Sequence, residues 1–539
     1  MIWLGATLGV PLAMLLLCLS RDLRYRMVTW LPLAAIPGLG AALFASDTSL
    51  ALPPVLLRLR LALDVPGAVL LGVAALLWIG GGVYAMGWLR GDPRRGRIAV
   101  WWLLTLTGSL GVFIAADLVS FYLLFSMVSL AAYGLVIEGE TPDAQRVGLI
   151  YVALAVFGEA LLLIGFVMLA VTTPGDGLIR DVVAGLRDSS RPNAILALII
   201  LGFGVKLGMV PFHVWMPVTY RTAPIPAAAV MSGAAVKAGV IGLIRFLPLG
   251  ATMPVWGQVL AILGFVSAFY GVAIGIRQAN PRMVLAYSSV SQMGVLMAVF
   301  GMGLATGDAG VALAAAFYGA HHILVKGGLF LGVGLAPLAG APRVGPVLVP
   351  AAIMALGLAG LPLTGGFLAK LAIKPLLGDG VAGTLGALSS AATALLMTHF
   401  LFRVAALPSV ASGRAVPIAL RGPWLLTALA SVLVPWVLYP AVLGGSLPYA
   451  LSPAALLGAI WPVLAGAAAG VALQRWCRRM IPVREGDLII PASIGAGKVV
   501  LAIGAAIGRV DTVLRQWPVA VTSLLVVALA LAAFMWAGS

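Results

Sequence analysis

The sequence predicts an all-α membrane protein, a polytopic bundle of about 14–16 transmembrane helices of about 20 residues each. Of its 539 residues, 62% are hydrophobic and only 9% are charged, and the mean hydropathy is +1.11. Globular chains carry about 25% charged residues, so this chain has too few to cover a water-facing surface. A soluble enzyme, a secreted disulfide scaffold and a disordered chain are excluded. Continuous rather than alternating apolar runs also exclude a transmembrane β-barrel.

Sixteen apolar runs follow one another, and no connection between them is long enough for a separate soluble domain. We place the runs near residues 2–18, 28–46, 67–89, 98–116, 118–137, 147–171, 193–216, 226–249, 255–276, 283–304, 310–336, 347–378, 383–402, 422–443, 453–473 and 518–536. The first run lacks a basic start and a small-residue cleavage site, so we interpret it as a retained helix rather than a signal peptide. Residues 475–517 combine arginines with small residues, which fits either a helix along the membrane surface or a partial crossing.

Arginine distinguishes the two sides of the predicted membrane. Connections after odd-numbered runs carry nineteen Arg, and connections after even-numbered runs carry five. Because cytoplasmic loops hold the excess of basic residues, we expect a multi-pass protein of a bacterial-type inner membrane with its N-terminus outside. The same distribution accounts for the net charge of +16 without a nucleic-acid partner. Cys18 and Cys477 are too far apart in sequence to indicate a disulfide framework or a zinc site.

Helix-breaking residues interrupt two of the runs. Pro211 and Pro217 flank His213 in the seventh run, and Gly-Leu-Ala-Gly-Leu-Pro-Leu-Thr-Gly-Gly occupies 357–366 in the twelfth. Backbone freed at membrane depth is tolerated where it lines a cavity or packs inside protein. A pair of interrupted helices, one in each half, is typical of inverted-repeat transporters and indicates their binding site. The simpler alternative is that Gly and Pro are common in membrane helices.

Lysine and arginine occupy different places in this chain. Five of the six lysines fall inside the predicted runs, whereas the twenty-seven arginines are almost confined to connections. A buried lysine can lose its proton, while arginine stays charged, so a membrane protein that needs switchable charges would keep lysine inside. Ionisable groups at membrane depth are costly and therefore indicate function. The candidate residues of a proton relay are Lys206, Glu159, Lys237, His322, Lys326, Lys370, His213, His321, Lys374 and His399.

Simpler interpretations exist for some of the ionisable residues. Asp117 lies at a short turn between two runs, where it would cap a helix. Arg245 stands near the end of its run and would extend to the membrane interface, and Lys374 would do the same. His399 lies near Arg403 and would only mark the cytoplasmic boundary.

Four stretches of the sequence carry distinctive motifs. They are G-V-K-L-G-M-V-P-F-H-V-W-M-P at 204–217, A-P-I-P-A at 223–227 leading into M-S-G-A-A-V-K-A-G at 231–239, L-A-Y-S-S-V-S-Q-M-G at 285–294, and H-I-L-V-K-G-G-L-F-L at 322–331 followed by G-G-F-L-A-K at 365–370. Together they resemble the antiporter-like subunits shared by respiratory complex I, membrane-bound hydrogenases and Mrp-type sodium/proton antiporters. The resemblance covers roughly residues 100–405.

The resemblance implies two inverted five-helix repeats, each forming half of an ion channel. The implied parts are N-terminal helices in 1–97, a first repeat in 98–249, a second repeat in 255–404, and C-terminal helices in 417–539 with the surface helix near 475–517. It also implies that Lys206 is the central switch of the first half and that Lys237 connects the halves. His322 and Lys326 would serve the second half, with Lys370 as its terminal exit or entry site.

Two positions depart from the family pattern. Relatives usually carry Glu in the fifth helix, where this sequence has Ser126, and Glu159 stands in the sixth run instead. We expect that Glu159 has become the carboxylate partner of Lys206; the alternative is that this half has lost its switch. A second histidine of the family's eleventh helix is Tyr318 here, and His321 is a candidate replacement.

These features predict an ion-translocating subunit of a larger membrane complex, moving H⁺ or Na⁺ through a buried Lys/His/Glu relay. The resemblance implies a redox-driven complex of the quinone oxidoreductase (NADH dehydrogenase) or hydrogenase type. The alternatives are a subunit of an Mrp-type antiporter or of an inorganic-carbon uptake complex, and a non-conducting membrane scaffold. With no cysteine cluster, haem motif or dinucleotide fingerprint, we expect no cofactor and no metal on this chain. Expected partners are other membrane subunits, the lipid bilayer, and protons or sodium ions.

Overall fold

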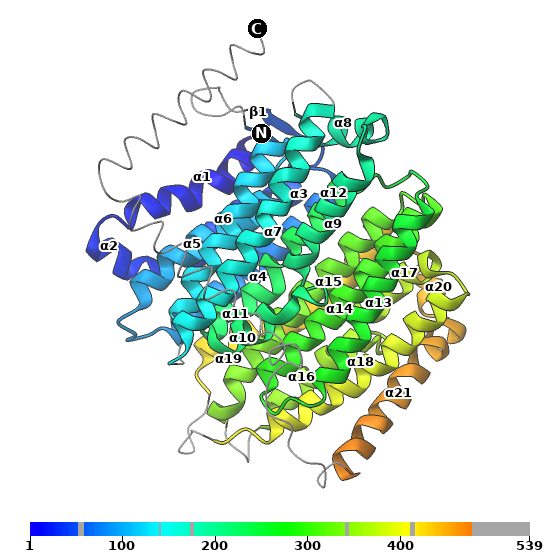
Figure 1. The fold of residues 1–539 in the computed structure, drawn as a ribbon. Helices are drawn as coiled ribbons and strands as arrows, with labels where there is room; N and C mark the ends of the chain where they lie inside the picture. Colours follow the sequence, from blue (N-terminus) through cyan, green and yellow to red (C-terminus); the bar gives the residue numbers. More distant parts are fainter. Residues whose placement is uncertain (52–58, 140–141, 173–176, 340–343, 410–415, 477–539) are drawn as a thin grey trace, which may run out of the picture. The chain divides into compact units, whose positions relative to one another are not determined.

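Helices make up most of the described part of the computed structural model, which Figure 1 colours in chain order. The structure describes residues 1–51, 59–139, 142–172, 177–339, 344–409 and 416–476, which belong to one unit spanning Met1–Val483. Residues 477–517 of the predicted surface helix, and the last predicted run at 518–536, lie outside the described residues.

The N-terminal part of the fold contains helices and one small hairpin. The helices are α1 (Ile2–Leu17), α2 (Arg21–Arg26), the 3₁₀ helix η1 (Met27–Ala35), α3 (Ile36–Phe44) and α4 (Val65–Trp88). Before α4, β1 (Ser49–Ala51) pairs antiparallel with β2 (Arg60–Ala62). The hydrophobic pattern did not predict this hairpin.

Two sets of five helical segments follow, and the fourth segment of each set is broken. The first set comprises α5 (Arg95–Gly111), α6 (Leu118–Ile137), α7 (Ala144–Thr172), α9 (Pro192–Leu207) with η3 (Phe212–Val214) and α10 (Trp215–Thr222), and α11 (Ile225–Val230) with η4 (Met231–Ala235) and α12 (Lys237–Phe246); α8 (Ile179–Ala184) and η2 (Gly185–Asp188) connect α7 to α9. The second set comprises α13 (Pro254–Gly275), α14 (Pro281–Thr306), α15 (Val311–Ala339), α16 (Gly345–Ala359) with α17 (Gly365–Leu377), and α18 (Val381–Ala405). After them come α19 (Ile418–Leu443), α20 (Leu447–Ala450) and α21 (Pro453–Trp476). The inverted relation between the two sets stays a prediction.

The predicted fold class, a polytopic all-α membrane bundle, is confirmed. Within the described residues, twelve helices are long and apolar enough to cross a membrane, and α1 and α16 are shorter apolar helices. Every predicted run that falls in the described part of the chain coincides with a helical segment. The reason is that a bilayer core requires about 20 apolar residues whose backbone is hydrogen-bonded within the segment.

Both predicted helix breaks are present, and a glycine forms each of them. α9 ends where Gly208 adopts φ +75°, and α16 ends where Gly360 adopts φ +101°. Only glycine enters this left-handed region without a steric cost. Thr364 then starts α17, because its side chain caps the amide of Phe367.

The centre of the bundle is covered by protein on all sides. The segment from α11 to α12 and the whole apolar length of α14 are buried, and α15 is nearly so. In α7, α19 and α21, about a third or fewer of the residues in the apolar stretch are buried. The outer helices therefore present apolar faces that suit hydrocarbon, whereas the central helices are surrounded by other helices.

Polar side chains close several helix ends, and Asp117 is one of them. Its carboxylate accepts a hydrogen bond from the Ser120 amide at 2.8 Å and caps α6, as the sequence predicted. Arg282 donates to the carbonyls of Tyr220, at 3.0 Å, and of Ala223, at the end of α10. The last carbonyls of a helix have no partner within the helix, so a guanidinium that reaches them stabilises the end.

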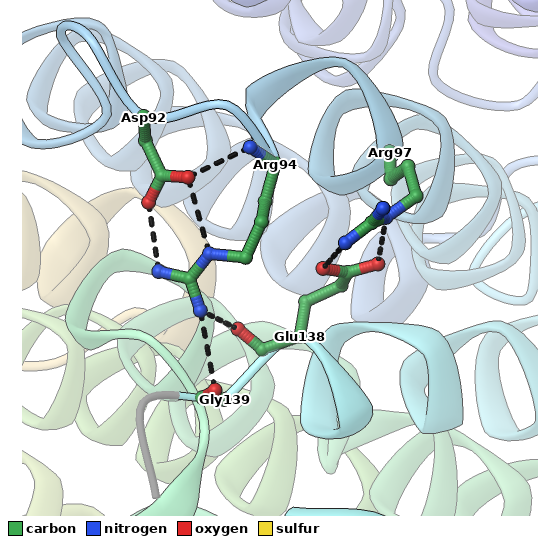
Figure 2. Close-up of polar contacts among 5 residues, drawn as sticks. All are labelled: Asp92, Arg94, Arg97, Glu138 and Gly139. Atoms are coloured by element: carbon green, nitrogen blue, oxygen red, sulfur yellow. Dashed lines mark hydrogen bonds and ion pairs between the residues drawn. The ribbon is translucent and has the colours of Figure 1, made fainter.

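Figure 2 shows a second arginine that reaches the last carbonyls of a helix, here at the end of α6. Arg94 donates to both carboxylate oxygens of Asp92 and to the carbonyls of Glu138 and Gly139, where α6 ends. Arg97 forms a two-pronged ion pair with Glu138, with N–O distances of 2.6 and 3.0 Å. The hydrogen bonds from Arg94 lower the pKa of the Asp92 carboxyl below its ordinary value.

Arg245, expected only to extend to the interface, makes similar contacts at another edge. Its guanidinium donates to the carbonyl of Phe113 at 2.6 Å and to that of Ala115, just after α5. It also lies 3.3 Å from the carboxylate of Asp64, the residue that caps α4. Arg245 therefore connects the ends of three helices.

Candidate functional site

Lys237, His322 and Lys326 form a cluster of ionisable side chains in the centre of the bundle. The ammonium nitrogen of Lys237 lies 2.6 Å from Nδ1 of His322 and donates to the Ser232 carbonyl at 3.2 Å. Lys326, one turn after His322 on α15, donates to the Leu285 carbonyl of α14 at 2.8 Å. All three side chains are fully buried, and His322 interacts electrostatically with both lysines. Protonation of one group therefore raises the free energy of charging the next.

A widened helical turn positions Lys237. The π-helical segment η4 ends at Ala235, two residues before Lys237, and the Lys237 ammonium returns to the carbonyl of Ser232, five residues earlier. Gly233 lets the turn pack tightly, because a Cβ there would lie 2.2 Å from Leu77 and 2.8 Å from the Ile323 carbonyl. Such turns occur frequently at functional sites, and the sequence pattern did not predict this one.

Lys206 and Glu159 belong to a second buried group, between α6, α7 and α9. Lys206 donates a hydrogen bond to the Ser129 hydroxyl at 2.9 Å. The carboxyl of Glu159 lies beside the hydroxyls of Ser126 and Ser129 and interacts electrostatically with Lys206. No direct ion pair joins these two described residues. The structure thus places Glu159 next to Ser126, the position where the family resemblance led us to expect a glutamate.

Two glycines bring α7 and α9 close enough for this arrangement. A Cβ on Gly158 would lie 3.1 Å from Cβ of Val205, and a Cβ on Gly202 would lie 3.0 Å from the Gly158 carbonyl. On the α6 side, the ring centroid of Phe125 lies 5.6 Å from the Lys206 nitrogen. The surroundings of Lys206 are therefore packed by small residues on one side and by an aromatic face on the other.

His213 lies in the break between α9 and α10 and is completely buried. Its ring centroid is 5.0 Å from that of Tyr270 on α13 and 6.1 Å from that of Tyr287 on α14. These contacts place His213 against the second five-helix set, although it belongs to the first.

His321 and Lys370 meet at the second helix break. The His321 ring fits against Gly365 and Gly366, where an added Cβ would lie 2.9 and 2.8 Å from ring atoms. His321 interacts electrostatically with Lys370 of α17 and also with its neighbour His322. Adjacent histidines on α15 thus contact two different groups of ionisable residues.

A cleft of about 540 Å³ begins at Lys370. Lys374 and Asp379 line it, together with Thr384 at the start of α18 and Tyr449 of α20. Lys374 is exposed in the cleft and is the most exposed of the five candidate lysines; its extension to the membrane interface stays a prediction. One basic and one acidic side chain, Lys374 and Asp379, therefore line the cleft beside Lys370.

Tyr318 and His399 make hydrogen bonds outside these groups. The Tyr318 hydroxyl donates to Oε1 of Gln292 at 2.5 Å, and Nε2 of Gln292 donates to Thr393 at 3.0 Å. His399 contacts the Gln278 carbonyl at 2.8 Å and the side-chain amide of Gln474 at 2.5 Å. His399 therefore holds the connection between α13 and α14, and the structure does not bring it to the lysines.

The structure thus brings together Glu159 with Lys206, Lys237 with His322 and Lys326, and His321 with Lys370. Sequence reasoning missed Ser129 and the Ser232 carbonyl. For Ser129 a signal existed, because it lies three residues after Ser126 and shares its helix face. For the Ser232 carbonyl no signal existed, because it depends on a backbone irregularity.

Comparison with known families identifies a broad relationship. The profile of the family described as "NADH:quinone oxidoreductase/Mrp antiporter, TM" matches residues 115–398, just over half of the chain. Hydrogenase-4 component B of Escherichia coli (strain K12) is 28% identical over 292 residues, 51% of this chain and 43% of that protein. The putative antiporter subunit mnhA2 of Staphylococcus saprophyticus is 28% identical over 300 residues, 51% of this chain and 37% of that protein. The uncharacterized protein Rv0083 of Mycobacterium tuberculosis is 31% identical over 313 residues, 54% of this chain and 48% of that protein.

The matched part of the chain spans less than half the length of each of these relatives. Two solved structures share its fold. The structure of the Mrp complex from Dietzia sp. DQ12-45-1b has a TM-score of 0.74 at 23% identity and covers 100% of this chain and 63% of that chain. The membrane-bound sulfane sulfur reductase, an archaeal respiratory membrane complex, has a TM-score of 0.67 at 18% identity and covers 87% of this chain and 99% of that chain.

Proposed function

Because the chain belongs to the NADH:quinone oxidoreductase/Mrp antiporter family of membrane subunits, we propose that it translocates protons or sodium ions as part of a larger membrane complex. The observation that carries the proposal is the contact between Lys237 and His322, 2.6 Å apart and fully buried. These two groups come from the two five-helix sets. In chain order they fall between Lys206, the proposed switch, and Lys370, the proposed opening, and we assign them the link between the halves.

The relay works through charges that bias one another. A charge change at Lys206 alters its interaction with Glu159, and a proton shared by Lys237 and His322 alters the free energy of charging Lys326. His321 then connects His322 to Lys370, where the cleft opens. Each step requires only that a group at membrane depth gains or loses a proton.

Glu159→Gln tests the first half, since glutamine keeps the shape of the side chain and removes its charge. In membrane vesicles that contain the native complex, we expect loss of proton uptake, followed with a pH-sensitive dye. Arg180→Gln, which removes a charge from an exposed side chain, is the matched control and keeps pumping. Normal pumping by Glu159→Gln would show that this carboxylate is not the partner of Lys206.

We propose that redox chemistry in partner subunits drives the transport. Similarity to hydrogenase-4 component B supports this energy source, and equal similarity, 28%, to a putative antiporter subunit supports an Mrp-type antiporter as the second candidate. Purification in mild detergent, with identification of the bound partners, separates the two. Flavin or iron–sulfur proteins would support the first candidate, and small multi-span proteins the second.

We also propose a bacterial-type inner membrane with the N-terminus outside, since the arginine-rich connections then lie in the cytoplasm. Alkaline phosphatase fused in the 378–380 connection is expected to be active, and green fluorescent protein fused at residue 408 is expected to fluoresce. The opposite pattern would reverse the orientation.

A further inference from the structure

The hydroxyl of Ser129 lies between the two ionisable groups of the first half. Lys206 donates to it at 2.9 Å, and the Glu159 carboxyl lies beside it. No direct ion pair joins Lys206 to Glu159 among the described residues. A proton that passes from one to the other therefore needs an intermediate group. We propose that the Ser129 hydroxyl is this group, which makes Ser129 a further catalytic residue; the inference rests on the proposed function.

The surrounding contacts hold Ser129 in this position. Ser129 is 1% exposed, and its backbone carbonyl accepts a hydrogen bond from the Tyr151 hydroxyl at 2.8 Å. This bond fixes α6 against α7, the helix that carries Glu159. The Trp215 indole, at the start of α10, donates to the Val205 carbonyl of α9 at 2.9 Å, next to Lys206. These two bonds fix α6 against α7 and α10 against α9 on either side of the proposed transfer.

Ser126 provides an internal comparison. It lies three residues before Ser129 on the same helix face, and its hydroxyl also lies beside the Glu159 carboxyl. Yet no described residue forms a hydrogen bond with the buried Ser126 hydroxyl, and none forms one with Oε1 of Glu159. The two serines differ in their relation to Lys206, because of the two only Ser129 accepts a hydrogen bond from it. Substituting each in turn therefore separates a bridging hydroxyl from one that only lies beside the carboxyl.

The transfer is balanced and needs no co-reactant. The Lys206 ammonium gives a proton to Oγ of Ser129 while the Ser129 hydroxyl gives its own proton to the Glu159 carboxylate. One N–H bond and one O–H bond break, and two O–H bonds form, leaving a neutral amine, an intact hydroxyl and a carboxylic acid. A small cavity of about 10 Å³, lined by Ser129, Lys206, Tyr151 and Trp215 among others, adjoins the transfer.

The test compares substitutions of the two serines in vesicles that contain the full complex. We expect Ser129→Ala to slow translocation at least about tenfold, the lower end of what positioned proton transfer contributes. Ser129→Thr keeps a hydroxyl and is expected to recover to within about threefold of the wild type. Ser126→Ala removes a hydroxyl at the same carboxyl but leaves the hydrogen bond between Lys206 and Ser129 in place, so it is expected to slow translocation less than Ser129→Ala does. Melting temperatures and a solvent deuterium isotope effect are measured for each variant.

The bridge is supported if Ser129→Ala loses translocation rate, Ser129→Thr recovers it, and the melting temperature stays unchanged. Three results would overturn it. The first is a wild-type translocation rate in Ser129→Ala, and the second is an equal loss of rate in Ser129→Ala and Ser126→Ala. The third is a loss of rate together with a lowered melting temperature in both Ser129 variants. Lys206→Ala and Glu159→Gln are measured in parallel. If they are inactive while Ser129→Ala is normal, only the bridge fails; if they are active, the proposed function of this half fails.

Discussion

Replacing Lys237 with methionine is expected to leave the fold stable and to stop ion translocation. A lysine at the centre of a membrane helix costs about 2.5–3.5 kcal/mol on insertion scales, and methionine removes that cost while filling a similar volume. Against this gain, Nδ1 of His322 loses a partner at 2.6 Å, and an unsatisfied buried group costs about 1–3 kcal/mol. The two effects nearly cancel, so the melting temperature should not fall. Lys237→Ala differs because it also leaves a cavity, which costs about 2–5 kcal/mol for a side chain of this size.

The measurement is thermal unfolding of the purified complex in detergent, followed by tryptophan fluorescence, beside dye-based pumping in vesicles. Lys237→Met should match the wild type in melting temperature, Lys237→Ala should melt lower, and neither should pump. Two results would refute the reasoning: equal destabilisation by both substitutions, or pumping by Lys237→Met. The first would mean that the hydrogen bonds of Lys237 stabilise the fold, and the second that its charge is not required.

Two further predictions concern the fold. Gly366→Ala is expected to lower yield and melting temperature, because its Cβ would lie 1.8 Å from the Gly357 carbonyl and overpacking costs about 1–3 kcal/mol or more; Gly380→Ala, which meets nothing within 4 Å, should be normal in the same assays. Asp92→Asn is expected to lower stability at about pH 7 by less than about 1 kcal/mol. Because Arg94 lowers the pKa of the Asp92 carboxyl in the folded state, this contribution exists above the ordinary Asp pKa and is lost as pH falls through the lowered value. The difference from wild type should therefore disappear once the pH falls below the lowered pKa of Asp92, and a difference that persists in stronger acid would contradict the interpretation.

Hydropathy alone was sufficient to predict where the chain crosses the membrane, because the bilayer imposes length and apolarity on every helix. The helix break at 357–366 was predictable for a related reason, since Gly360 requires a left-handed backbone. The hairpin of β1 and β2 was not predictable, because its pairing joins short segments without an alternating pattern. The capping role of Arg94 was also not predictable, as the carbonyls it reaches lie more than forty residues further along the chain.

The candidate site was likewise predictable from the sequence only in part. Composition identified the ionisable side chains, and the family resemblance suggested their order, but neither gave their partners. The contact between Lys237 and His322 joins positions 85 apart in sequence and depends on the π-helical turn before Lys237. The position of Glu159 beside Ser126 depends on how α7 packs against α6, which a single sequence does not encode in any local pattern.

The burial of the central helices has a consequence for biosynthesis. The chain is made from its N-terminus, so when Lys206 is synthesised its partner Ser129 already exists, 77 residues earlier. Lys237 is different, because His322 is synthesised 85 residues later. For that interval α12 carries a lysine that lacks its His322 partner and that lipid does not tolerate well, so the earlier helices have to shelter it until α15 arrives. Insertion of this protein is therefore cooperative at its centre, and a truncation between α12 and α15 should be degraded rather than stably integrated.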